Sequence, residues 1–88
     1  MINYEFLKQN QEKLKQIYYK ERILNQCKLG ALFIDFSKGG PDVYFLTLEN
    51  MPETIKQKFL QKENLNQLNT IFLYVFDQND SKIMDVLI

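Results

Sequence analysis

This chain contains few residues that could carry out nucleophilic catalysis. The sequence contains no histidine, and its single cysteine is Cys27. A catalytic nucleophile needs a base beside it, and histidine most often fills that role. Cys27 is expected near the C-terminal end of a helix, where the helix dipole disfavours a thiolate. We therefore interpret Cys27 as a structural thiol, and we predict no catalytic residue and no enzymatic activity.

Carboxylates are the remaining groups that could perform acid–base chemistry. Asp35 and Asp85 interrupt strand segments that are otherwise apolar. A carboxyl group held among apolar side chains has its proton affinity raised, which suits a general acid. The simpler interpretation is that both are solvated or edge-protecting charges, since every second residue of a half-buried strand faces water. Nothing in the spacing of the acids makes two or three of them converge on a metal. We predict neither a metal site nor a cofactor site.

The one glycine-rich element is the segment Lys38-Gly39-Gly40-Pro41. Phosphate loops place such a segment before a helix, whose N-terminal amides bind the anion. Here the segment stands between two stretches with strand periodicity. We interpret it as the turn of a β-hairpin.

Basic residues are concentrated at the start of the chain. Residues 1–28 carry six basic and three acidic side chains, although the whole chain has a formal net charge of zero. Lys8, Lys15 and Arg22 recur at heptad spacing, which places them on one side of a helix. This possible basic surface suggests an alternative function, nucleic-acid binding through the N-terminal helix. The other interpretation is an ordinary solvated helix face.

Length and composition predict one small soluble domain over residues 1–88. The chain has 88 residues and a mass of 10.6 kDa, with 45% hydrophobic residues, so it can bury a single core. A single cysteine is typical of a reducing compartment, and the N-terminal residues lack the apolar run of a signal peptide. The longest near-apolar run, residues 71–76, is far too short to span a bilayer. We expect a cytoplasmic location and no membrane contact.

Periodicity predicts six elements that would position these residues. Residues 3–29 form one long helix, from an N-cap at Asn3 to a stop at Gly30. Strand alternation follows over 31–37 and 43–49. Asn50 and Glu53 form a capping box that opens a second helix of about 12 to 15 residues. Two further strands cover 70–77 and 82–88.

The predicted hairpins place apolar residues on defined faces. In the first hairpin, pairing Phe36 with Tyr44 aligns three apolar cross-strand pairs. In the second hairpin, pairing Asp77 with Lys82 produces an all-aliphatic face that contains Leu73 and Val75. The reverse face of that hairpin carries aromatic residues. Both of its faces are apolar, so we expect it to lie centrally or to be covered on both sides.

The order α-β-β-α-β-β predicts an α+β fold. It corresponds to a permuted split β-α-β plait, a two-layer sandwich with a four-stranded antiparallel sheet and two helices on one face. A right-handed crossover through the second helix would place the C-terminal strand between the second and third strands. The other sheet face would then be uncovered.

An uncovered aromatic sheet face indicates a protein-binding function. The aromatic residues exceed what two helices can cover, and aromatic rings dominate interface energies. Acidic residues on the same strands argue against binding of RNA by the sheet. We hypothesise a small non-enzymatic interaction module that self-associates, or binds or inhibits a larger protein. A homodimer is favoured. The candidate partner-binding residues are Phe33, Phe45, Phe72, Tyr74 and Phe76.

Overall fold

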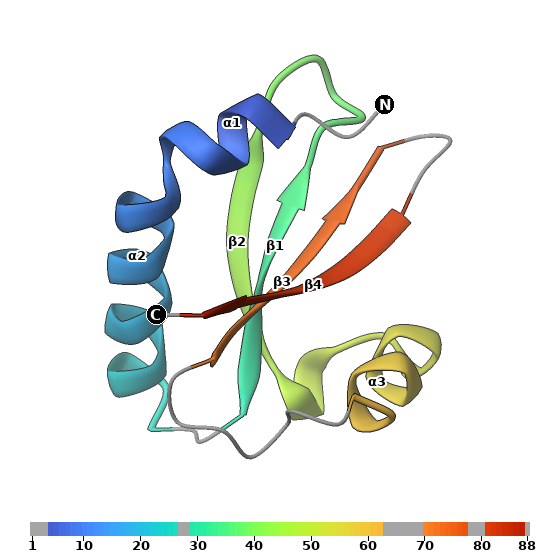
Figure 1. Ribbon diagram of the computed structural model, residues 1–88. Helices are drawn as coiled ribbons and strands as arrows, with labels where there is room; N and C mark the ends of the chain where they lie inside the picture. Colours follow the sequence, from blue (N-terminus) through green and yellow to red (C-terminus); the bar gives the residue numbers. More distant parts are fainter. Residues whose placement is uncertain (1–3, 27–28, 63–69, 78–80, 88) are drawn as a thin grey trace.

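A computed structural model describes residues 4–26, 29–62, 70–77 and 81–87, and within them it confirms the α+β class (Figure 1). The predicted order of helices and strands is also confirmed, with the first helix divided in two. The elements are α1 (Tyr4–Gln9), α2 (Gln11–Leu24), β1 (Gly30–Asp35), β2 (Asp42–Thr47), the short 3₁₀ turn η1 (Leu48–Asn50), α3 (Glu53–Leu60), β3 (Thr70–Phe76) and β4 (Ser81–Leu87).

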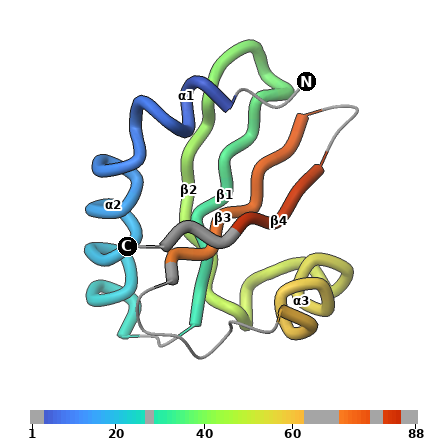
Figure 2. Tube along the Cα trace, viewed as in Figure 1, coloured from blue at the N-terminus to red at the C-terminus, as the bar shows by residue number. Residues whose placement is uncertain are grey.

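The four strands form one mixed sheet in the order β2-β1-β3-β4 (Figure 2). The outer pairs are antiparallel, whereas β1 and β3 are parallel neighbours at the centre. The predicted all-antiparallel sheet, with the C-terminal strand in the interior, is therefore wrong in this detail. All six residues of β1 are buried, and a strand that is apolar on both faces needs a neighbour on each side. β4 carries Lys82 and Asp85 and occupies an edge.

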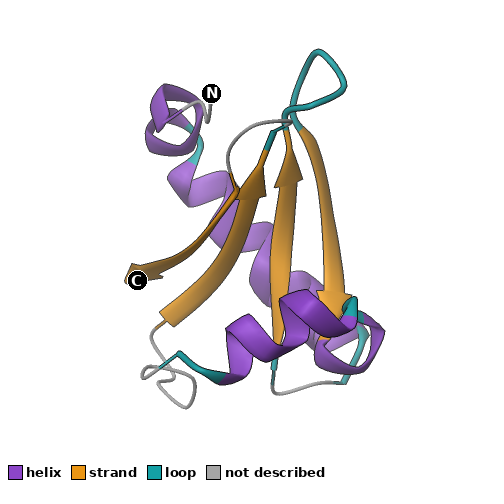
Figure 3. Cartoon of the chain, turned by 90° about the vertical axis from the view of Figure 1, so that its right-hand side faces the viewer, coloured by secondary structure: helices purple, strands orange, loops and turns teal. Residues whose placement is uncertain are grey.

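The helices α1 and α2 cover one face of the sheet. Figure 3 shows α2 crossing behind the strands. Leu7, Leu14 and Tyr18 project from these helices and are 8%, 4% and 1% exposed. They pack against the aliphatic side chains of the two central strands, which are Leu32, Ile34, Ile71, Leu73 and Val75. This aliphatic cluster is the larger half of the core.

The helix α3 lies on the opposite face of the sheet, in front of the strands in Figure 3. The expectation that both helices share one face is therefore wrong. Phe59 of α3 is 1% exposed, and its ring lies 6.1 Å from that of Phe72 and 6.3 Å from those of Phe33 and Tyr74. Ala31 and Met51 complete this aromatic cluster. Because β1 and β3 are apolar on both faces, each face requires its own cover.

The predicted N-terminal helix is interrupted at Asn10. The backbone N–H of Asn10 donates to the Phe6 carbonyl at 3.0 Å, and its side-chain Nδ2 donates to the same oxygen at 2.9 Å. Asparagine competes in this way for helix carbonyls and favours helix ends. The helix also ends earlier than predicted, because α2 stops at Leu24 and Gln26 takes the left-handed conformation with φ 50°. Gly30 begins β1 instead of ending the helix, and the predicted cap at Asn3 lies outside the described residues.

The second helix begins two residues later than a capping box at Asn50 would place it. Its N-cap is Pro52, and no side chain caps it there, so the predicted pairing of Asn50 with Glu53 is wrong. Asn50 instead closes the turn η1. Pro52 still marks the start, since its fixed φ suits the entry to a helix and its carbonyl accepts from the Lys56 amide at 2.8 Å. α3 has 8 residues, fewer than predicted.

The first hairpin has a different register from the predicted one. Phe33 pairs with Tyr44 and Leu32 with Phe45, whereas the prediction paired Phe36 with Tyr44. An odd shift moves every β2 side chain to the other face relative to β1. Because Ala31 and Phe33 are as apolar as Leu32 and Ile34, the apolar pattern does not distinguish these registers.

The second hairpin retains its predicted faces with a register shifted by two residues. Leu73 pairs with Met84 and Val75 with Lys82. An even shift leaves each side chain on its original face. The aliphatic and aromatic faces of β3 are accordingly those predicted, and both are covered.

Gly30 lies where α2 is packed against the first hairpin. A side chain on Gly30 would collide with the ring of Phe45. That ring contacts Tyr18 edge to face at 5.9 Å between centroids, and the Tyr18 hydroxyl donates to the Gly30 carbonyl at 3.4 Å. Glycine at this position lets the helix, the strand backbone and the Phe45 ring approach one another.

We expect Gly30→Ala to destabilise the protein by about 1–3 kcal/mol, because the added methyl group overpacks the contact with Phe45. Gly40→Ala is the matched control, since nothing lies within 4 Å of a methyl group there. Urea denaturation of both variants measures the difference. An equal decrease in the free energy of unfolding in the two variants would contradict the close approach of the Phe45 ring to Gly30.

We expect Phe59→Ala to cost roughly 3–5 kcal/mol, as for other buried phenylalanine truncations. Leu60→Ala, at a neighbouring side chain that is 43% exposed, should cost under about 1 kcal/mol. NMR shifts of the variant should change at Phe33 and Tyr74. If the shift changes were confined to the aliphatic cluster, α3 would have to lie on the same face as α1 and α2, which would contradict the structure.

Candidate functional site

The five aromatic residues predicted to bind a partner do not form one exposed face. Phe33, Phe72 and Tyr74 are 1%, 2% and 7% exposed and belong to the aromatic cluster beneath α3. Phe76 is half-buried at the edge of that cluster, and Phe45 lies on the opposite face against Tyr18. The prediction of an uncovered aromatic face is therefore wrong, because Phe59 covers its centre. Of the five, Phe45 and Phe76 retain partial exposure.

The strand β2 forms an edge of the sheet and offers an apolar row that is only partly covered. Tyr44 is 39% exposed, and Val43, Phe45 and Leu46 are half-buried. The corresponding positions of β1 are 0–1% exposed. Natural edge strands are commonly protected by lysine, proline or a bulge. Residues 43–47 contain no charge and no proline, and β2 pairs with β1 through six consecutive residues. We call the outer side of Asp42–Thr47 the β2 edge.

Tyr44 is the most exposed aromatic side chain of the β2 edge. Its ring stacks on that of Phe33 at 5.4 Å, with 11° between the ring planes. Partial burial, and then the charges of Asp35 and Asp42, raise the pKa of the Tyr44 hydroxyl. The hydroxyl is therefore protonated at neutral pH and can donate a hydrogen bond.

A groove of about 260 Å³ runs between the helices α1 and α2 and the outer half of the sheet. Its helical wall repeats every three or four residues from Tyr4 to Lys15, as one side of a helix does. Its floor comes from β3 and β4. We call this feature the lysine groove. The lining residues are Tyr4, Leu7, Lys8, Gln11, Leu14, Lys15, Ile71, Leu73 and Met84.

The three residues of the predicted basic surface divide between two environments. Lys8 and Lys15 line the lysine groove. Arg22 lies beyond it, with its guanidinium carbon 5.7 Å from the centre of the Tyr18 ring, a cation–π contact. The sequence analysis found Lys8 and Lys15 but missed Leu7, Gln11 and Met84. Their helical spacing and the aliphatic face of β4 were visible, but the contact between them depends on the tertiary packing.

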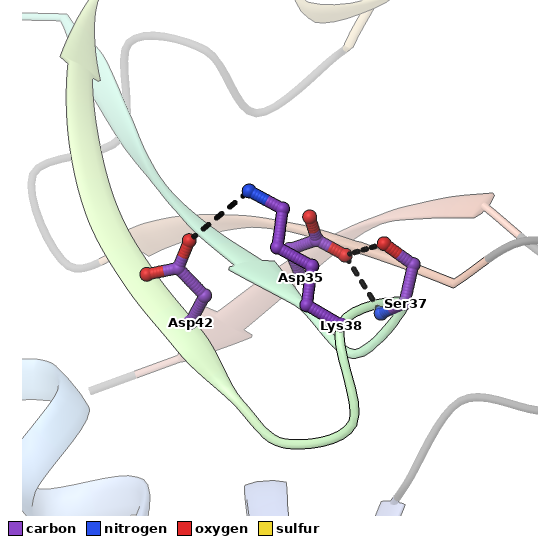
Figure 4. A network of polar contacts seen from close by, with 4 residues as sticks. All are labelled: Asp35, Ser37, Lys38 and Asp42. Atoms are coloured by element: carbon purple, nitrogen blue, oxygen red, sulfur yellow. Dashed lines mark hydrogen bonds and ion pairs between the residues drawn. The ribbon is translucent and has the colours of Figure 1, made fainter.

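Asp35 is buried at the end of β1 and holds the loop that follows. Its Oδ1 accepts hydrogen bonds from the Ser37 hydroxyl at 2.6 Å and from the Ser37 backbone N–H at 2.7 Å (Figure 4). Lys38 in the same loop pairs with Asp42 at 3.9 Å. The Ser37 hydroxyl, then the Ser37 amide, lowers the pKa of Asp35, and these donors outweigh the effect of burial.

These contacts correct the expectation that Asp35 has a raised proton affinity. The carboxylate is ionised and organises a turn, which is a structural role and does not suit a general acid. The side chain of Asp85 and all of Cys27 lie outside the described residues. Across the described ranges, no group of three or more His, Cys, Asp or Glu residues could hold a metal ion.

Among the helices of the described part of the chain, none combines the length and the apolar character needed to cross a bilayer.

Comparison of the chain with protein-family models, with curated proteins and with solved structures finds no match.

We expect Ser37→Ala to bring the pKa of Asp35 up toward its ordinary value of about 3.9, because the larger of its two stabilising hydrogen bonds is removed. Carbon-detected NMR titration of the carboxyl group measures this change. Ser37→Thr keeps the hydroxyl and should keep the pKa low. A pKa that does not differ between the two variants would contradict the role of the hydroxyl.

The same contact predicts a pH dependence of stability. The folded pKa of Asp35 is lowered, so its contribution is present above the unfolded pKa and is lost as pH falls through the folded pKa. The wild type should lose this contribution below about pH 4. The decrease in the free energy of unfolding on acidification should be smaller for Ser37→Ala than for the wild type, as measured by urea denaturation at matched pH values. A larger acid loss in Ser37→Ala would contradict this assignment.

Proposed function

We propose that this protein is a small non-enzymatic interaction module that binds other protein chains through the β2 edge. The observation that carries the proposal is a regular, uncharged and partly exposed edge strand at Val43–Thr47. Such an edge presents unpaired backbone groups that another strand can complete. Its half-buried side chains would be covered at the same time. This mode replaces the aromatic sheet face of the sequence-based hypothesis, since that face is covered by α3.

A second copy of the chain is the occupant that the β2 edge suits directly. Two copies of β2 related by a twofold axis would run antiparallel and extend the sheet from one subunit into the other. Asp42 stands at one end of the strand, so antiparallel pairing keeps the two aspartates at opposite ends of the contact. The formal net charge of zero imposes no overall repulsion between copies. These points support the homodimer that the sequence analysis favoured.

The nucleic-acid alternative has less support. Two of its three cations, Lys8 and Lys15, line an apolar groove, and Arg22 is engaged with Tyr18. The interruption at Asn10 also separates Lys8 from the helix that carries the other two.

Light scattering of Tyr44→Lys tests the edge directly. We expect wild type to have twice the 10.6 kDa chain mass and Tyr44→Lys to be monomeric. A lysine at the edge would have to lose its hydration in the paired sheet. The fold should survive, since Tyr44 is 39% exposed and losing its stack on Phe33 costs about 0.5–1.5 kcal/mol.

Leu60→Lys is the matched control, because Leu60 is 43% exposed on α3, on a different element from the edge. It should leave the dimer intact. Circular dichroism of all three proteins confirms that each is folded. A monomeric wild type, or a dimer that Tyr44→Lys leaves unchanged, would contradict edge pairing between copies.

A further inference from the structure

The floor of the lysine groove has little accessible surface, and this restricts what can reach it. Leu7, Leu14, Ile71 and Leu73 line the groove yet are only 2–8% exposed. An α-helix with its side chains is about 10 Å across, so a partner helix cannot reach this floor. A single extended hydrocarbon chain can, since it needs only the width of one methylene group. The apolar lining would exclude water from such a chain.

The rim of the groove carries positive charge. Lys8 and Lys15 are seven residues apart along the helical wall, and Gln11 lies between them. At the Tyr4 end, the Lys82 ammonium lies 5.7 Å from the Tyr4 ring centre. Two acids of the same helices lie near the groove. Glu12 pairs with Lys15 at 3.6 Å and partly offsets the charge of that lysine, while Glu5 accepts a hydrogen bond from Gln9. Lys8 is exposed at the rim and attracts an anion.

An apolar floor and a cationic rim together match a molecule with one hydrocarbon chain and one negative head group. We propose that the lysine groove binds a single-chain amphiphile with a carboxylate head, the chain lying over Ile71, Leu73 and Met84 and the head at Lys8 or Lys15. A cationic amphiphile would meet like charge at the rim. A second copy of the chain does not suit this groove, because its own α1 and α2 carry the same lysines. This site is separate from the β2 edge and does not depend on the proposed dimer.

The test uses decanoate, octanoate and decyltrimethylammonium below their micelle concentrations, titrated into the full chain and followed by NMR of the backbone amides. Decanoate should bind at one saturable site and shift residues of the groove. Each added methylene should tighten binding about three- to fourfold, so decanoate should bind roughly tenfold more tightly than octanoate. Decyltrimethylammonium should bind at least tenfold more weakly than decanoate.

Paired lysine variants separate the groove from general surface charge. Lys8→Gln with Lys15→Gln should weaken decanoate binding roughly three- to tenfold, as expected for two solvent-exposed ion pairs. The matched control is Lys20→Gln with Lys58→Gln, two exposed lysines outside the groove, which should change binding less than twofold. Lys8, Lys20 and Lys58 are exposed, and Lys15 is half-buried at the rim with one exposed ion pair to Glu12, so all four substitutions should leave the chain folded. Equal losses in the two double variants, equal binding of the cationic amphiphile, or no saturable binding of decanoate would overturn the proposal.

Discussion

The structure depends on one parallel pair of strands that is buried on both faces. In β1, Leu32 and Ile34 face α1 and α2, while Ala31 and Phe33 face α3, and all four are 0–1% exposed. β3 repeats this arrangement with Leu73 and Phe72 on opposite faces. A strand pair of this kind is stable only when helices cover both sides. The placement of α3 opposite α2, and of β2 and β4 at the edges, follows from that requirement.

Much of this architecture is encoded in local patterns, and the sequence analysis recovered that part. The strand alternation located all four strands to within two residues at each end, and the even-numbered shift in the second hairpin preserved its faces. The order of the strands could not be recovered in the same way. β1, β3 and β4 all read as apolar on both faces, so pattern alone does not say which two are central. The register of the first hairpin failed for the same reason, since Phe33 and Ile34 are interchangeable in an apolar pattern.

The candidate binding surfaces were also only partly predictable from the sequence. The sequence shows more aromatic strand residues than two helices were expected to cover. In the structure, Phe59 contacts three of these rings, although it is the single buried side chain of the 8-residue helix α3. Which face such a short helix covers is decided by tertiary packing. The lysine groove joins residues from α1, α2, β3 and β4. The helical spacing and the aliphatic strand face were visible in the sequence, but the contact between them was not. Asp35 shows the limit of arguing from burial alone, because two donors from Ser37 reverse the expected direction of its pKa shift.

The two proposed binding surfaces differ in place, since the β2 edge is formed by one outer strand and the lysine groove is lined by residues of β3 and β4. Both depend on a sheet in which β1 and β3 form the parallel centre. Native-state hydrogen exchange measured by NMR is the measurement to make first, because amides at a doubly covered centre exchange only through global unfolding. We expect the slowest exchange in Leu32–Ile34 and Leu73–Val75, with faster exchange in β4. Slowest exchange in β4, with β1 exchanging early, would contradict this expectation and would restore the topology with the C-terminal strand in the interior.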